Sequence, residues 1–312
     1  MGLLKFTKDY TSSDDGAKLT GTELGVLQAD IAAVINGGLS NANVASDAAI
    51  VESKVSFDTA SGHNHNGSNS RTISSGAFRG FIQGAELEWV ATDQVKATSG
   101  VMDIAGTLYT RTSYSTTLDL DTNTDWVEGI SQRGTSKWAY VYAYNSSGSL
   151  WDIKLWLYPP QYADTGTDDS SVKIYRQDSS VWYRCLGAIR LNATGSGNIT
   201  KFFQSGDMVT CDEISDHKVL TNGAQTSFTS FDCSTAVPAI SILCGFYVNT
   251  GASLTFYFAT TATAATIGGN SNQSTSIAQC DTVMLTAAQA CYYKVSGSTI
   301  DVWVKYFKLN IR

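Results

Sequence analysis

The run Asp119–Glu128 carries oxygen-bearing side chains at alternate positions, which is the arrangement of a calcium-binding loop. Two features of such a loop are missing. The sixth position is not glycine, and the twelfth position is Ile130, where a glutamate would complete the ligands. The other interpretation is a strand that starts near Tyr114 and runs into a polar turn before Trp126, and we expect that structure.

His63 and His65 are two of only three histidines, and they lie in the polar run Ser61–Ser70. In an extended chain, residues two apart point to the same side, so both imidazoles would face one direction. The other interpretation is a solvated loop in which the histidines cap turns. His217 stands in Ser-Asp-His-Lys without such a neighbour, and we expect it at the surface.

Sequence signatures of catalysis are missing. The chain has no G-x-S-x-G nucleophile turn and no H-E-x-x-H metal motif. A glycosidase needs only two carboxylates at a fixed separation in space, which a single sequence does not reveal. We therefore expect a protein that is not an enzyme.

The six cysteines all lie in the C-terminal part of the chain: Cys185, Cys211, Cys233, Cys244, Cys280 and Cys291. An even number suits disulfides, but Met1–Tyr10 has no apolar segment typical of a secretory signal. No pair has C-x-x-C spacing, so a zinc site has no local support. We expect mostly buried free thiols that behave as small hydrophobic side chains, in a protein made in a reducing cytosol.

The composition limits the classes of protein. Of 312 residues, 16% are charged, against about a quarter in ordinary soluble domains. Hydrophobic residues at 43% and aromatic residues at 11% exclude a disordered chain and suffice for a sizeable core. The net charge of −7 argues against binding to nucleic-acid phosphates. The longest apolar runs, such as Ala239–Val248, fall short of the roughly 20 residues that span a bilayer.

A short helix is expected near the N-terminus. Thr20 and Glu23 fit a capping box, and Asn36-Gly-Gly38 is a helix-end signal. Between them, four apolar residues have the spacing of a coiled-coil seam: Leu24, Leu27, Ile31 and Val34. A helix of this length is marginal alone, so we expect this seam to pack on its own copies or on another protein.

From about Phe81 onward, apolar residues alternate with a period of two, which is typical of strands. The clearest runs are Trp138–Tyr144, Ile153–Tyr158, Ile240–Val248, Leu254–Phe258 and Ile300–Phe307. In the last run we expect Tyr306 on the face of Ile300, and Phe307 on the opposite face. No helical stretch interrupts these runs, so we predict a mainly β fold of antiparallel sandwiches or a barrel.

One face of the first run is aromatic, with Trp138, Tyr140, Tyr142 and Tyr144. Such rings can stack on sugars, because they combine a flat apolar body with a polar edge. The same alternation arises in any strand that packs one face in a core. We expect this face to be core.

Two groups of motifs resemble, in order and spacing, the virion fibre proteins of tailed bacteriophages, both tail fibres and head fibres. The first group is similar to fibre attachment regions and consists of Leu39–Val44, Ala48–Ile50, Ser53-Lys54 and Gly62–Gly67. The second is similar to a β-rich distal module and consists of Trp138–Tyr144, Tyr158–Pro160, Tyr183–Gly187, Gly197–Gln204 and Val237-Pro238. In the family the Tyr-Arg-x-x-Gly element closely follows the double proline. Here Gln161–Val181 intervenes, and we expect a longer loop.

The resemblance implies a homotrimeric fibre with its N-terminus on the particle. Residues 1–60 are expected to form an attachment segment that contacts other virion proteins, and residues 61–80 a connector. Residues 81–312 are expected to form the distal β-sandwich region, with a subdivision near Arg190. No nucleic-acid partner and no membrane insertion are expected.

The resemblance also implies a metal. Some fibres bind one through His-x-His on a three-fold axis, where three chains supply six imidazoles, the number that an octahedral transition metal accepts. The hypothesis that the resemblance adds is therefore a transition metal at His63 and His65 on the trimer axis, and the solvated loop stays as the alternative.

The resemblance implies a short tail fibre, assembled in the host bacterial cytoplasm, whose distal region contacts a glycan or protein of the host surface. The alternative is a head fibre or capsid decoration protein, because the same N-terminal motifs occur in both. A virion-associated enzyme that degrades glycans is the third interpretation. Fibres of that kind resemble long β-helices with repeated short strands, and this sequence has no such repeat.

Overall fold

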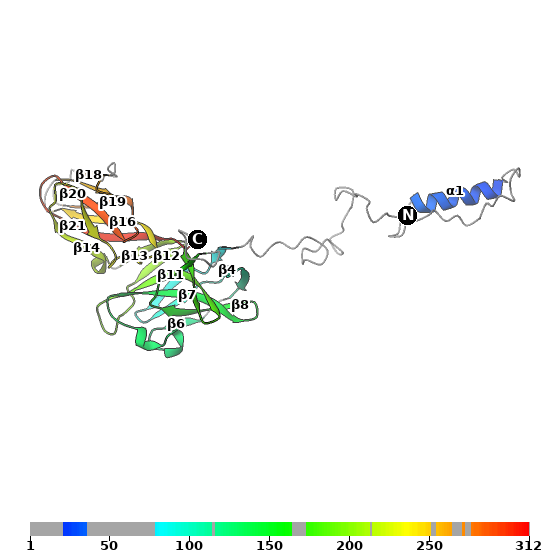
Figure 1. Ribbon diagram of the computed structural model, residues 1–312, viewed down its shortest axis with the longest axis horizontal. Helices are drawn as coiled ribbons and strands as arrows, with labels where there is room; N and C mark the ends of the chain where they lie inside the picture. The colour runs from blue at the N-terminus through cyan, green and yellow to red at the C-terminus, as the bar shows by residue number, and fades with distance from the viewer. Residues whose placement is uncertain are drawn as a thin grey trace. The chain divides into compact units, whose positions relative to one another are not determined.

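A computed structural model describes residues 21–35, 79–113, 116–163, 173–212, 214–250, 254–263, 270–271 and 276–311. The chain divides into two units, Met1–Thr72 and Ile73–Arg312, and each is described by itself. In the first unit, α1 (Gly21–Ile35) covers the stretch in which the capping box and the seam predict a helix. No described helix has the length and hydrophobicity that a membrane span requires. The second unit, called the β unit, contains the strands (Figure 1).

The largest sheet of the β unit has nine strands. Its path is β19–β16–β21–β13–β12–β2–β3–β6, and β14 pairs with β21 beside this path. The strand bounds are β2 (Leu87–Ala91), β3 (Gln94–Ala97), β6 (Thr117–Asp119), β12 (Phe202–Ser205), β13 (Met208–Cys211), β14 (Lys218–Gly223), β16 (Ser241–Thr250), β19 (Ser276–Met284) and β21 (Ile300–Leu309). Strands from both halves of the β unit therefore share one sheet, joined where Phe203 of β12 pairs with Glu88 of β2.

Three smaller sheets complete the described part of the β unit. The first runs β8 (Leu150–Trp156), β7 (Lys137–Ser147), β11 (Val181–Leu191), β10 (Lys173–Asp178) and β9 (Tyr162–Ala163). The second runs β1 (Ile82–Gly84), β4 (Gly100–Ile104) and β5 (Thr107–Arg111), and the third β15 (Thr229–Asp232), β20 (Ala290–Val295), β17 (Leu254–Ala259) and β18 (Asn270–Ser271). All the strand pairs in these four sheets are antiparallel. The predicted mainly β, antiparallel fold is confirmed.

The five-stranded sheet is buried on both faces. On β7, Ala139, Val141 and Ala143 belong to the smaller core, which is formed by buried residues between positions 85 and 199. Tyr140 and Tyr142 of the same strand belong to the larger core, formed by buried residues between positions 140 and 311. Alternate side chains of β7 therefore pack in two different cores, one on each face of the sheet. Each large side chain buried in this way contributes about 1.5–3 kcal/mol.

The face of β21 changes partway along the strand, which corrects one expectation. Ile300, Val302 and Val304 are buried as predicted, but Phe307 is buried next and Tyr306 is not. The pairing with β16 shifts register here, because Gly245 faces Tyr306 while Phe246 faces Val304. A β-bulge of this kind inserts one residue into a strand and exchanges its faces. The prediction of an unbroken alternation through Tyr306 was wrong for this reason.

The segment Gln161–Val181 was expected to be a long loop, and the described part of it is not. It contains β9 and β10, and β10 pairs with β11 from Tyr175 opposite Arg184 to Asp178 opposite Val181. Ile174 and Tyr175 are buried in this strand. The described part of this segment therefore extends the five-stranded sheet.

Candidate functional sites

The residues expected to mediate trimer contacts or bind metal lie in the first unit. His63 and His65 fall outside the described residues. The seam lies on α1, where the side chains of Leu24 and Ile31 are 46% and 39% exposed. These two side chains are exposed on the described helix, and a partner that packs on them would remove them from water.

The acidic run Asp119–Glu128 forms the strand end and polar turn expected for it. Asp119 ends β6, and its carboxylate accepts hydrogen bonds from the backbone N–H of Asp121 at 2.8 Å and from the Gln94 amide at 3.2 Å. The Asp125 carboxylate accepts a bond of 2.7 Å from the backbone N–H of Asp119, and Asp121 pairs with Arg133. These carboxylates order the turn.

The aromatic face of β7 is largely core, as expected. The side chains of Tyr140 and Tyr142 are 3% and 0% exposed, and burial raises the pKa of both hydroxyls above the ordinary value. The Tyr142 ring meets Trp156 and Tyr183 edge-on. These rings are therefore not available for stacking on a sugar.

A groove of about 530 Å³ opens at one end of this aromatic face. It is called the Trp138 groove, and its lining includes Gln132, Lys137, Trp138 and Tyr158. Tyr158 is 44% exposed, and its ring lies 4.7 Å from the guanidinium of Arg176, which also stacks on Trp156. The side-chain oxygen of Gln132 is buried without a hydrogen-bond partner among the described residues. Aromatic rings beside amide and ammonium groups suit a hydroxyl-rich ligand.

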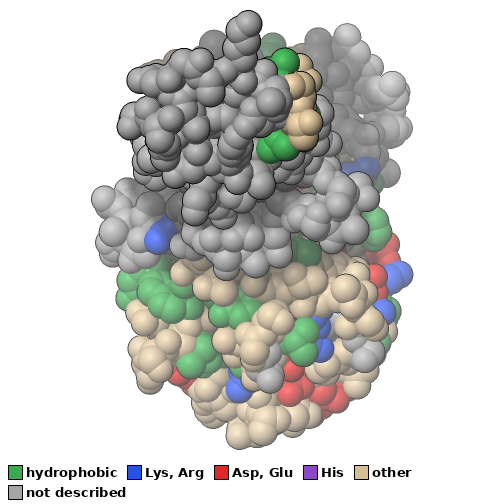
Figure 2. Space-filling view, turned by 90° about the vertical axis from the view of Figure 1, so that its right-hand side faces the viewer, with side chains coloured by type: hydrophobic (Ala, Val, Ile, Leu, Met, Phe, Trp, Pro, Cys, Tyr) green, Lys and Arg blue, Asp and Glu red, His purple; other side chains and the backbone are tan. Residues whose placement is uncertain are grey.

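The rest of the visible surface offers no single apolar face. On the coloured face of Figure 2, hydrophobic side chains form separate patches among polar atoms. Of the exposed large apolar side chains on the β unit, Phe203 is the most exposed at 69%. Exposed apolar residues that stand apart in this way are normal for a protein surface.

His217 was expected at the surface, and this expectation was wrong. It ends a short 3₁₀ helix, Ile214–His217, and its side chain is 2% exposed. Its Nδ1 lies 3.2 Å from the carbonyl oxygen of Ala236 and 3.6 Å from the Cys211 sulfur. Burial lowers the pKa of His217 below its ordinary value, and the charge of Arg190 acts in the same direction. The residues next to His217 in the sequence are polar and suggest exposure. The contacts with Ala236 and Cys211 that bury it form only in the folded structure.

A buried polar cluster joins β4, β10 and β11. The hydroxyl of Tyr175 donates to the carboxylate of Asp103, and Arg184 lies 3.4 Å from that hydroxyl. Asp103 and Arg184 are both 0% exposed. Arg184 also donates to the main-chain oxygens of Gly80 and Ile311, at 2.9 and 2.7 Å. Because these bonds end on main-chain groups at the two ends of the β unit, the cluster is structural.

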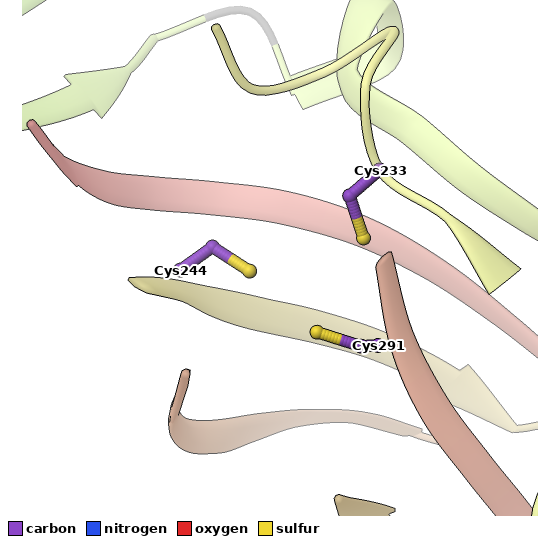
Figure 3. Close-up of side chains that lie close together, drawn as sticks. All are labelled: Cys233, Cys244 and Cys291. Atoms are coloured by element: carbon purple, nitrogen blue, oxygen red, sulfur yellow. The ribbon is translucent and has the colours of Figure 1, made fainter. Parts of the chain in front are cut away.

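Three buried thiols form a second cluster that sequence analysis missed. The sulfur atoms of Cys233, Cys244 and Cys291 lie within 4.8 Å of one another, and all three side chains are 0% exposed. Figure 3 shows the three sulfur atoms directed toward a common space. The five cysteines whose side chains are described are buried and free, as expected for small hydrophobic thiols, but this grouping was not anticipated.

The three thiols do not hold their protons equally. Hydrogen bonds from the Cys233 thiol, and next from the Cys244 thiol, lower the pKa of Cys291 below its ordinary value. Burial, followed by the hydrogen bonds to the other two thiols, raises the pKa of Cys244 well above its ordinary value. Cys185, a buried thiol outside this cluster, has its pKa raised to about 12 by burial. The proximity of three thiols distinguishes the cluster from an ordinary buried thiol such as Cys185.

No protein-family model matches this chain, and no curated protein matches it either. The function of the chain is therefore inferred from its motifs, its fold and the geometry of these sites.

Proposed function

We propose that this chain is a structural protein of a tailed-phage virion, namely a short homotrimeric tail fibre. Its N-terminal segment, residues 1–60, attaches it to the particle, and its β unit contacts the host cell surface. The observation that carries the proposal is the order of the two motif groups, from Leu39–Val44 to Val237-Pro238. The antiparallel β unit and the exposed apolar side chains on α1 are compatible with this assignment.

The Trp138 groove is the surface of the β unit best suited to a host glycan. It has the exposed ring of Tyr158, together with Gln132 and Lys137, around one opening. Stacking of a sugar on Tyr158 needs no movement of the buried rings of β7.

Immunogold labelling of intact phage with an antibody against residues 81–312 tests the proposal. Gold at the tail supports a tail fibre. Gold on the capsid replaces it with the alternative of a head fibre or capsid decoration protein. If no part of the particle carries gold, both the tail-fibre proposal and its head-fibre alternative are contradicted.

Binding of the full-length protein to host cells tests the role of the groove. Tyr158→Ala is expected to weaken binding about two- to tenfold, since stacking of this kind contributes about 0.5–1.5 kcal/mol. Phe203→Ala, which removes an exposed aromatic ring outside the groove, is the matched control and should bind as the wild type does. Equal binding by the wild type and both variants would contradict a role of the Trp138 groove in host contact.

A further inference from the structure

Cys233, Cys244 and Cys291 come from three separate segments of the β unit. Cys244 lies on β16 of the nine-stranded sheet, and Cys291 lies on β20 of the four-stranded sheet. Cys233 directly follows β15, the strand that pairs with β20. A ligand held by all three sulfur atoms would tie two sheets together (Figure 3).

The spacing of the sulfur atoms suits a single metal ion. A metal–thiolate bond is about 2.3 Å long, so three sulfur atoms in a triangle around one ion lie about 4 Å apart. The three sulfur atoms already lie within 4.8 Å of one another. A movement of a fraction of an ångström by each side chain would close the difference.

The surroundings of the sulfur atoms favour a soft cation. All three side chains are 0% exposed, so water does not solvate a thiolate here. The charged neighbour that acts on Cys233 from outside the cluster is Asp232, an acid, which offers no positive charge. Thiolates prefer soft ions, and one monovalent cation between the three sulfur atoms would neutralise the one thiolate that its binding creates.

The number of donor atoms in the cluster decides which soft cation fits it. Structural zinc is almost always four-coordinate, whereas this cluster of described side chains supplies three sulfur donors and no fourth histidine or carboxylate. Among soft ions, Cu(I) accepts a closed three-sulfur site. The main-chain oxygen of Met284, 3.9 Å from the Cys291 sulfur, is a hard donor that Cu(I) does not favour.

We propose that Cys233, Cys244 and Cys291 form a buried three-sulfur site for one thiophilic monovalent cation of the Cu(I) type. Binding of its single positive charge releases one thiol proton to solvent, so that one cysteine binds as a thiolate and two bind as thiols, with no change in the oxidation state of sulfur or metal. The ion bridges the nine-stranded and four-stranded sheets of the larger core.

The test uses the full-length protein expressed in copper-supplemented medium and purified without oxygen. Elemental analysis is expected to give one copper per chain, and X-ray absorption to give three sulfur ligands on that copper. Copper bound by nitrogen ligands, as at histidines, would overturn the proposal, and so would a disulfide among the three cysteines. This measurement needs no variant.

Substitutions locate the site. Cys244→Ser and Cys291→Ser are each expected to weaken Cu(I) binding at least about tenfold in competition with a chromophoric Cu(I) chelator. Cys185→Ser, which changes a buried thiol outside the cluster, is the control and should retain the wild-type affinity. Equal affinity in the cluster variants and the control would overturn the assignment. If Zn(II) bound as tightly as Cu(I), the assignment of a three-coordinate site would be overturned, because structural zinc is almost always four-coordinate.

Discussion

The guanidinium of Arg184 donates a hydrogen bond of 2.7 Å to the main-chain oxygen of Ile311. The same nitrogen donates to the main-chain oxygen of Gly80 at 2.9 Å. Arg184 is fully buried, and burial lowers its pKa from the ordinary value while the neighbouring Tyr175 opposes this shift. One buried cation therefore holds two main-chain groups that are far apart in the sequence.

Replacing Arg184 should cost more stability than replacing any exposed arginine. Arg184→Met leaves the main-chain oxygens of Gly80 and Ile311 without this donor and the Asp103 carboxylate without the nearby positive charge. Loss of one member of a buried charged network costs about 3–5 kcal/mol. Urea unfolding measures the change. Arg176→Met, which loses stacking on Trp156 and Tyr158 and a hydrogen bond to the Pro159 main-chain oxygen, is the control and should cost about 1–2 kcal/mol. Equal losses in both variants would contradict this view of Arg184.

Gly187 is expected to tolerate no side chain. It lies at the register shift between β11 and β7, and a Cβ there would lie 2.7 Å from Leu87 Cδ1 and 2.9 Å from Gln204 Oε1. Both neighbours are buried, so Gly187→Ala should lower the free energy of unfolding by about 1–3 kcal/mol. Gly25→Ala, at a position with open space around it, should leave the unfolding of the β unit unchanged. An unchanged urea midpoint for Gly187→Ala would show that Leu87 and Gln204 move aside freely.

His217 should make the β unit sensitive to acid. Burial lowers its pKa in the folded chain, so the unfolded chain binds more protons as the pH falls through the ordinary histidine value of about 6.5. Stability is therefore lost below that pH, and above it His217 contributes no pH dependence. The urea concentration at which half of the wild type is unfolded should decrease as the pH is lowered from about 7.5 to about 5.5. In His217→Asn the fall should be smaller, and an identical fall would assign the acid sensitivity to other groups.

The seam on α1 is expected to hold the trimer. Ile31→Asp places a charge among apolar side chains of neighbouring copies, so sedimentation at a fixed concentration should show a lower trimer fraction than in the wild type. Gln28→Asp adds the same charge at another exposed position of α1 and should leave the trimer intact. A wild-type chain that sediments as a monomer would contradict the trimer.

The histidine pair predicts a metal that depends on His65. The full-length wild type should contain iron, zinc or nickel, and His65→Ala should lose most of it, because three of six ligands disappear from a trimer axis. His217→Asn, which changes a histidine buried in the β unit, is the control. Equal iron, zinc and nickel content in the wild type and His65→Ala would end this prediction.

The strands could be predicted because alternation is a local property. β7, β16 and β17 cover the runs Trp138–Tyr144, Ile240–Val248 and Leu254–Phe258 to within a few residues. The bulge in β21 could not be predicted, because it is defined by the pairing of Val304 and Tyr306 with a strand that lies far away in the sequence. β10 was missed because its short run, Lys173–Asp178, follows a polar acidic stretch that is typical of a loop.

The sites show the same division. The aromatic face of β7 could be assigned to a core, since its alternation is what a buried strand requires. The cluster of Cys233, Cys244 and Cys291 has no local spacing that announces it, because its members meet only when two sheets pack. The one signal in the sequence was the presence of Cys244 within an apolar run and Cys291 within an alternating one.

The contacts of Arg184 have a mechanical consequence. Since one side chain holds both Gly80 and Ile311, the polypeptide enters and leaves the β unit at neighbouring points. A tensile load applied between these points would be borne first by the hydrogen bonds around Arg184. Arg184 thus acts as a clasp, and its rupture would be the first event when the β unit is stretched by its two ends.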